Sequence, residues 1–168
     1  MIDDQAATLD DGTVLRILSH LNVQLYEEVL VDERPSVKSA EEAGAAIVAF
    51  LEENGEPIEG IKAGALGDTL DANAARGVLD LVLEDERVRR IAEPLVAHPP
   101  DDDQRAVELA AEGAIIIAAL VGFLQTKVEI DVNRKGGETE FHFALKKNAM
   151  DPAGLKEIAK KILELLLD

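Results

Sequence analysis

The clearest structural signal in this chain of 168 residues lies at residues 127–146, which read KVEIDVNRKGGETEFHFALK. Apolar and polar residues alternate in both halves, and this two-residue period is typical of a strand with one face in water. Gly136 and Gly137 stand between the halves and supply the backbone freedom that a tight turn needs. The pattern predicts a β-hairpin with one apolar face, made of Val128, Ile130, Val132, Phe141, Phe143 and Leu145.

A helix is predicted on each side of the hairpin. Residues 104–124 become apolar on all sides after Glu112, which indicates a buried central helix. Asp151 and Pro152 open the other helix, because aspartate caps helix N-termini and proline is tolerated in the first turn. We expect both helices to cover the apolar face of the hairpin, since an isolated two-stranded ribbon is only marginally stable in water.

The residues before this unit read as acidic helices behind a polar leader at residues 1–12. Helix starts are predicted where residues with capping side chains precede segments of helical apolar period. These caps are Asp11 or Thr13, Ser39 and Asp71, and a further helix is predicted from Asp85 to about Val96. Residues 23–31 fit either more helix or a short strand, and both interpretations stay open.

The sequence therefore predicts an α+β protein that is predominantly helical. Residues 1–98 form an acidic helical region, the proline- and aspartate-rich run 99–103 a linker, and residues 104–168 a helix–hairpin–helix module. One fused domain is the alternative, because a chain of this length also suits a single hydrophobic core.

The formal net charge of −17 is unevenly distributed along the chain. Residues 1–103 hold 24 acidic and 8 basic side chains, a net charge of −16, whereas residues 104–168 hold 10 acidic and 9 basic ones, a net charge of −1. Such a surface repels nucleic acid phosphates and anionic lipid headgroups, which argues against binding to nucleic acids or membranes. The acidic face serves either solubility in a salty cytoplasm or the docking of a basic partner.

Residue types that carry catalysis or bind metals are scarce. The chain has no cysteine, which excludes disulfides, a thiolate nucleophile and a zinc ribbon and favours a cytoplasmic location. Its first residues lack the layout of a signal peptide. His20, His98 and His142 are spaced too widely in sequence to form a helical metal pair. We therefore expect no catalytic, cofactor-binding or metal-binding residue, with an enzyme of unfamiliar site as a competing interpretation.

The apolar segment 113–124 is too short to span a membrane. It contains 12 residues without a charge, and a span needs about 20. We expect a buried helix here. The alternative is a membrane-active effector that exposes this segment on activation.

The C-terminal third has a distinctive order of elements: apolar helix, strand, glycine turn, strand, and a helix that opens with Asp-Pro. Segments 114–117, 126–132 and 134–139 carry this order. In layout and hydrophobic pattern, residues 104–168 resemble the effector-associated constant components of bacterial conflict and signalling gene clusters. The resemblance implies a non-catalytic adaptor that accompanies proteases, nucleases or caspase-like effectors.

We therefore expect a protein–protein interaction module, or an adaptor that associates with itself as a homo-oligomer. The hairpin leaves two strand edges unpaired unless residues 23–31 supply a third strand. Unpaired edges bind a second copy or an extended partner segment. The candidate interface residues are apolar residues of the predicted central helix and hairpin: Ile117, Phe123, Val128, Phe141 and Phe143.

Overall fold

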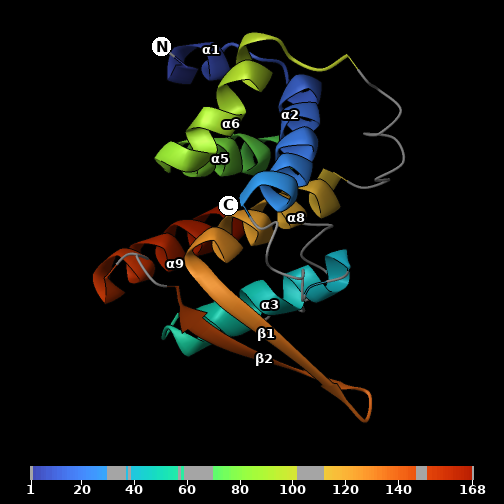
Figure 1. Ribbon diagram of the computed structural model, residues 1–168, viewed down its shortest axis with the longest axis vertical. Coiled ribbons are helices and arrows are strands. Elements are labelled where there is room, and N and C mark those ends of the chain that lie inside the picture. The colour runs from blue at the N-terminus through green and yellow to red at the C-terminus, as the bar shows by residue number, and fades with distance from the viewer. Residues whose placement is uncertain are drawn as a thin grey trace.

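The computed structural model describes residues 2–29, 37, 39–56, 58, 70–101, 112–146 and 151–167. It confirms a predominantly helical α+β fold with a two-stranded antiparallel hairpin and a C-terminal helix (Figure 1). The elements are α1 (Ile2–Ala7), α2 (Asp11–Gln24), the π-helix η1 (Leu25–Val29), α3 (Ala40–Glu53), α5 (Ala72–Leu83), α6 (Glu86–Ala97), α8 (Glu112–Lys127), β1 (Val128–Lys135), β2 (Glu138–Leu145) and α9 (Pro152–Leu167).

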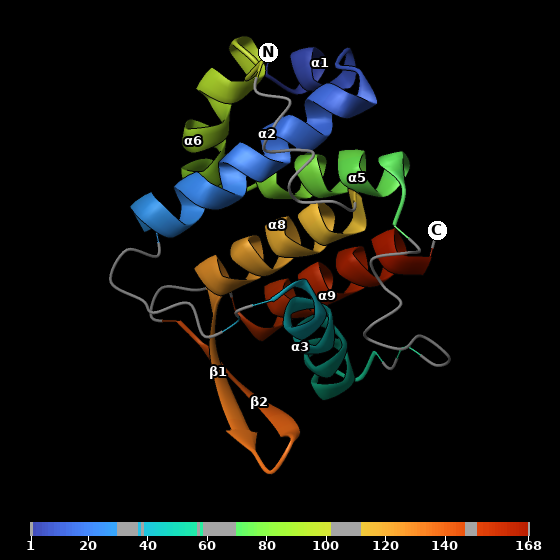
Figure 2. The same cartoon turned by 90° about the vertical axis from the view of Figure 1, so that its right-hand side faces the viewer.

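These elements form three tiers along the longest axis of the molecule (Figures 1 and 2). Helices α1, α2, α5 and α6 make one end, α8 and α9 cross the middle, and α3 lies with the hairpin at the other end. One hydrophobic core joins the tiers, with Leu18 of α2, Val78 of α5 and Ile116 of α8 among its members. The core thus contains residues from both sides of the 99–103 segment.

Helix α8 is buried on all sides, as its apolar circumference predicts. Every side chain from Ile115 to Thr126 is buried except Ala118, which is half-buried. The helix runs three residues beyond the predicted end at Leu124 and enters β1 without a loop. A close approach of α2 requires Gly122, because a methyl group there would lie 2.8 Å from Oδ1 of Asn22. Residues 104–111 of the predicted helix lie outside the described residues.

The first twelve residues are more ordered than a polar leader. Residues 2–7 form helix α1 and bury Ala6. Asp10, rather than Asp11 or Thr13, caps α2, and its carboxylate accepts hydrogen bonds from the amide (3.0 Å) and hydroxyl (2.7 Å) of Thr13. These bonds hold the pKa of Asp10 below its ordinary value.

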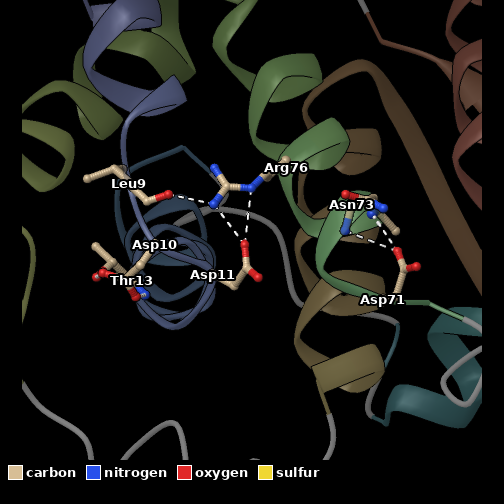
Figure 3. A network of polar contacts seen from close by, with 8 residues as sticks. Leu9, Asp10, Asp11, Thr13, Asp71, Asn73 and Arg76 are labelled. Atoms are coloured by element: carbon tan, nitrogen blue, oxygen red, sulfur yellow. Dashed lines mark hydrogen bonds and ion pairs between the residues drawn. The ribbon is translucent and has the colours of Figure 1, made fainter.

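An arginine of α5 ties this segment to the helical body. The Arg76 guanidinium donates to Oδ1 of Asp11 at 2.7 Å and to the Leu9 carbonyl, as Figure 3 shows. The same view shows Asp71 accepting the amide of Asn73 at 3.0 Å, which places it as the predicted cap of α5. Helix ends in this tier are therefore closed by side chains within the chain.

The caps predicted at Ser39 and Asp151 are confirmed, and Asp85, the predicted first residue of a helix, caps α6. Ser39 accepts the Glu42 amide at 3.1 Å, and Asp85 accepts the amides of Arg87 and Val88. Asp151 accepts the amide of Gly154 at 2.8 Å and opens α9.

The structure describes most of residues 23–31 and of the predicted linker 99–103. Residues 23–29 continue α2 and then form the π-helix η1, so they supply no strand. Residues 30 and 31 lie outside the described residues. In the predicted linker, the Pro100 carbonyl accepts a hydrogen bond from Nε of Arg16 at 3.0 Å, which ties this segment to α2. Residues 102 and 103 lie outside the described residues.

The hairpin forms in the predicted register. Val128 lies opposite Leu145, and the pairing continues to Lys135 opposite Glu138. The turn residues Gly136 and Gly137 have φ angles of +60° and +81°. Two positive φ angles are the mark of a type I′ turn, which matches the right-handed twist of the flanking strands.

Candidate interaction surface

Helix α3 covers the apolar face of the hairpin. The Phe143 ring meets Phe50 of α3 edge-on, with centroids 5.5 Å apart, and lies against Phe141 with centroids 6.4 Å apart. We expected the helices adjacent in sequence to provide this cover. Instead α8 leads directly into β1, and α9 reaches the base of the hairpin, where Leu155 lines a cleft with Val128 and Phe143.

A second contact joins α3 to the end of the hairpin near the turn. Nε of Arg134 on β1 donates to Oε1 of Glu42 at 2.6 Å, and the Glu42 side chain is 13% exposed. A cleft of about 390 Å³ lies between the two elements. Its lining includes Thr139 and Phe141 of β2 together with the first turn of α3. The hairpin is therefore held to α3 by an aromatic cluster and by an ion pair.

The base of the hairpin is fixed by a second ion pair. The Lys127 ammonium pairs with Asp85, the cap of α6, and the two side chains are 12% and 8% exposed. Burial by itself raises the pKa of Asp85. Lys127 and the amides of Val88 and Arg87 outweigh that effect and hold the pKa below its ordinary value. The first residue of the hairpin stretch is thus anchored to the acidic helical body.

Cover by the chain decreases from the base of β1 toward β2. Val128 is 1% exposed and Ile130 6%, whereas Val132, Phe141 and Phe143 are half-buried. Leu145 is 45% exposed, and only two other large apolar side chains in the described residues are exposed. The apolar face that the sequence predicts is therefore covered at the base of β1 and left partly open nearer the turn and on β2.

The predicted interface residues divide accordingly. Ile117, Phe123 and Val128 belong to the core of this chain, with at most 2% of each side chain exposed. Phe141 and Phe143 are half-buried at the hairpin surface. Phe141 and Phe143 therefore remain candidate interface residues, because the other three are covered by elements of their own chain.

The main chain of β2 has an unpaired outer edge among the described residues. The Lys146 amide donates to the Lys127 carbonyl at 3.2 Å, which fixes this pair as hydrogen-bonded. Opposed pairs alternate between bonded and non-bonded in an antiparallel ladder. The non-bonded residues of β2 are therefore Thr139, Phe141, Phe143 and Leu145, whose amides and carbonyls point away from β1.

No other described strand pairs with this edge. The sheet has two strands, and near the turn β2 forms the lower border of the molecule in Figure 1. Four alternate residues of β2 thus have backbone amides and carbonyls that point away from β1. Such an edge is a template for another strand.

The histidines lie on separate elements: His20 on α2, His98 after α6 and His142 on the outer face of β2. In the described part of the chain, no three histidine or acidic side chains are grouped to hold a metal ion. Nε2 of His20 is buried without a hydrogen-bond partner among those residues. Within the described residues, no helix is both long and apolar enough to cross a bilayer.

Comparison with known proteins assigns no family. No protein-family model matches the sequence, and no curated protein and no solved structure match the chain. The geometry of the hairpin and the chemistry of its edge are therefore the features that bear on function.

Proposed function

We propose that this protein is a non-catalytic protein–protein interaction module that binds its partner by strand addition to the outer edge of β2. The observation that carries the proposal is the row of outward-pointing backbone groups at Thr139, Phe141, Phe143 and Leu145. An added strand satisfies these groups by main-chain hydrogen bonds, and alternate side chains supply the specificity.

Two further features support a binding role for this edge. Leu145 and the half-buried Phe141 and Phe143 lie on the face beside it, so a partner strand also gains apolar contact. Residues 127–146 hold four acidic and four basic side chains, whereas residues 1–103 carry a net charge of −16. The hairpin is therefore a near-neutral element on an acidic protein.

Two observations on the sequence support an adaptor role in the cytoplasm. The resemblance of residues 104–168 to effector-associated constant components favours an adaptor in a bacterial conflict or signalling system. The absence of cysteine favours the cytoplasm as its compartment. In this role the acidic helical body holds the hairpin, and the hairpin edge recruits the partner.

A proline at Thr139 tests the proposal. The Thr139 amide points away from β1, so proline there removes an outward donor and leaves the bonds between β1 and β2 in place. We expect Thr139→Pro to lose association, by sedimentation at micromolar concentration and by affinity capture from the source cells. Thr139→Val changes the same exposed side chain but keeps the amide, and it should associate like the wild type.

The thermal unfolding midpoints of both variants check that they fold. If folded Thr139→Pro retains the self-association and the captured partners of the wild type, the edge of β2 is not the binding site. The proposed function would be contradicted if the wild-type protein does not associate with itself and captures no partner whose binding is lost in Thr139→Pro.

A further inference from the structure

Side chains on the outer face of β2 are arranged unevenly along the strand. Glu138 and Glu140 lie toward the turn, whereas His142 and Ala144 follow toward the base, all four exposed. A parallel neighbour of the same sequence would set glutamate beside glutamate. An antiparallel neighbour sets the acidic half opposite the half without acidic residues, and opposed like charges are the arrangement that destabilises a strand pair.

The inner face of β2 has a matching asymmetry. Leu145 projects with 45% exposure at the base, next to a cleft of about 160 Å³ that Asn54 and Leu155 also line. Thr139, at the other end of the strand, lines the larger cleft beside α3. An antiparallel copy of β2 would bring its Leu145 to Thr139 and its Thr139 to Leu145, so each exposed side chain lies beside a cleft.

From this self-complementarity we propose that the occupant of the β2 edge is β2 of a second copy, paired antiparallel about a two-fold axis at His142. The inference rests on the proposed function and names its partner. The two hairpins then form one four-stranded sheet with order β1–β2–β2–β1, and both α3 helices cover the same face of it.

An axis at His142 satisfies three conditions together. It pairs seven of the eight residues of β2, 139–145, with the same seven of the second copy, places Phe141 of each copy opposite Phe143 of the other, and sets Glu140 opposite Ala144. Aromatic pairs across neighbouring strands are among the more stabilising ones. An axis at Glu140 would instead oppose two identical carboxylates.

The charge of the chain is compatible with this pairing. Two copies that each carry a net charge of −17 repel one another, but the contact lies on the hairpin, where acidic and basic residues balance over 127–146. Repulsion between the acidic helical bodies is long-range and is screened by salt. The dimer should therefore tighten as the salt concentration rises, whereas a basic partner docked on the acidic surface would be released.

Because these 168 residues contain no cysteine, an introduced cysteine has no other thiol in the chain with which to pair. Around the proposed axis, the two copies of residue 142 form a non-hydrogen-bonded pair with Cα atoms about 4.5 Å apart, within the range a disulfide accepts. We expect His142→Cys to form a covalent dimer on mild oxidation, at a yield more than about tenfold above Glu140→Cys or Ala144→Cys alone. A mixture of Glu140→Cys and Ala144→Cys should cross-link.

The controls separate the possible failures. Each variant exchanges one exposed side chain, and a thermal melt confirms that it folds. Cross-linking between Glu140→Cys and His142→Cys, with none at His142→Cys alone, would overturn the proposed axis. A monomer at every salt concentration would overturn pairing between copies. In that case, partner capture lost in Thr139→Pro but kept in Thr139→Val would leave the proposed function standing.

Discussion

The helical body and the hairpin satisfy their backbone groups in opposite ways. In the body, side chains of the chain close the helix ends: Asp10, Ser39, Asp71 and Asp85 accept amides at N-termini. The hairpin continues from α8 and packs its apolar face on α3, while the outer edge of β2 has no partner strand in the described part of the chain. The proposed binding site is therefore the element whose polar groups the fold leaves open.

The same comparison applies to apolar surface. Helix α8 buries its whole circumference, whereas β2 leaves Leu145 exposed and two phenylalanines half-buried. Substitutions in the core should therefore act on folding. Substitutions on β2 should act on association with a smaller effect on stability.

The largest effect is expected for Ile117→Asp. Ile117 is 2% exposed inside α8, and an aspartate there buries a carboxylate without a cation. We expect a loss of about 4 kcal/mol or more in the free energy of unfolding, measured by urea denaturation. The matched variant Leu145→Asp places the same charge at a position that is 45% exposed, and it should cost about 1 kcal/mol. Equal losses in the two variants would contradict the contrast between α8 and β2.

An intermediate effect is expected for Lys127→Met, which leaves the buried Asp85 carboxylate without its cation. The expected loss in the free energy of unfolding is about 3 kcal/mol at pH 7. Lys161→Met is the control, because Lys161 pairs with Glu84 at side-chain exposures of 42% and 59%. An exposed pair of this kind contributes about 0–1 kcal/mol.

The pH dependence gives a second readout for the same pair. Although burial raises the pKa of Asp85, Lys127 and the backbone amides lower it further, so the folded pKa lies below the unfolded value near 3.9. A depressed carboxyl pKa stabilises the folded state above the unfolded pKa, and this contribution is lost as the pH falls through the folded pKa. The stability gap between wild type and Lys127→Met should therefore narrow below about pH 4. A gap that stays constant there would exclude Asp85 as its source.

Local patterns predicted the hairpin and most helix starts. Alternation fixes which residues of 128–145 share a face, and the glycine pair fixes the turn, because both signals come from neighbouring residues. The caps Ser39 and Asp71 were predictable for the same reason. The cap of α2 was misplaced by one residue if Asp11 is taken and by three if Thr13 is taken, since several residues near Asp10 have side chains that can cap a helix.

The cover of the hairpin was not predictable from local pattern. Arg134 meets Glu42 across 92 positions of sequence, and Glu42 reads locally as part of a capping box with Ser39. Asp85 likewise reads as a helix cap, and its pairing with Lys127 appears once α6 and α8 are brought together. The sequence indicated two open strand edges, and in the described residues neither β1 nor β2 has a partner strand on its outer side. Which side chains beside these edges stay exposed depends on tertiary contacts.

The smallest expected effect on stability is for two neighbouring arginines of α6. Arg90 makes an ion pair within α6, whereas Arg89 contacts residues of other helices. Arg90 pairs with Glu86 at side-chain exposures of 71% and 85%, so Arg90→Ala should change the free energy of unfolding by less than about 0.5 kcal/mol. Arg89 donates to the Leu83 carbonyl at 2.9 Å and to Asp3 of α1 at 3.1 Å. Arg89→Ala should cost about 1 kcal/mol, since it frees a carbonyl of α5 and detaches α1. Urea denaturation at low and high salt measures both. Equal losses would mean that the Arg89 contacts contribute no more than a solvated pair, and the acidic helical body would then owe its order to apolar packing alone.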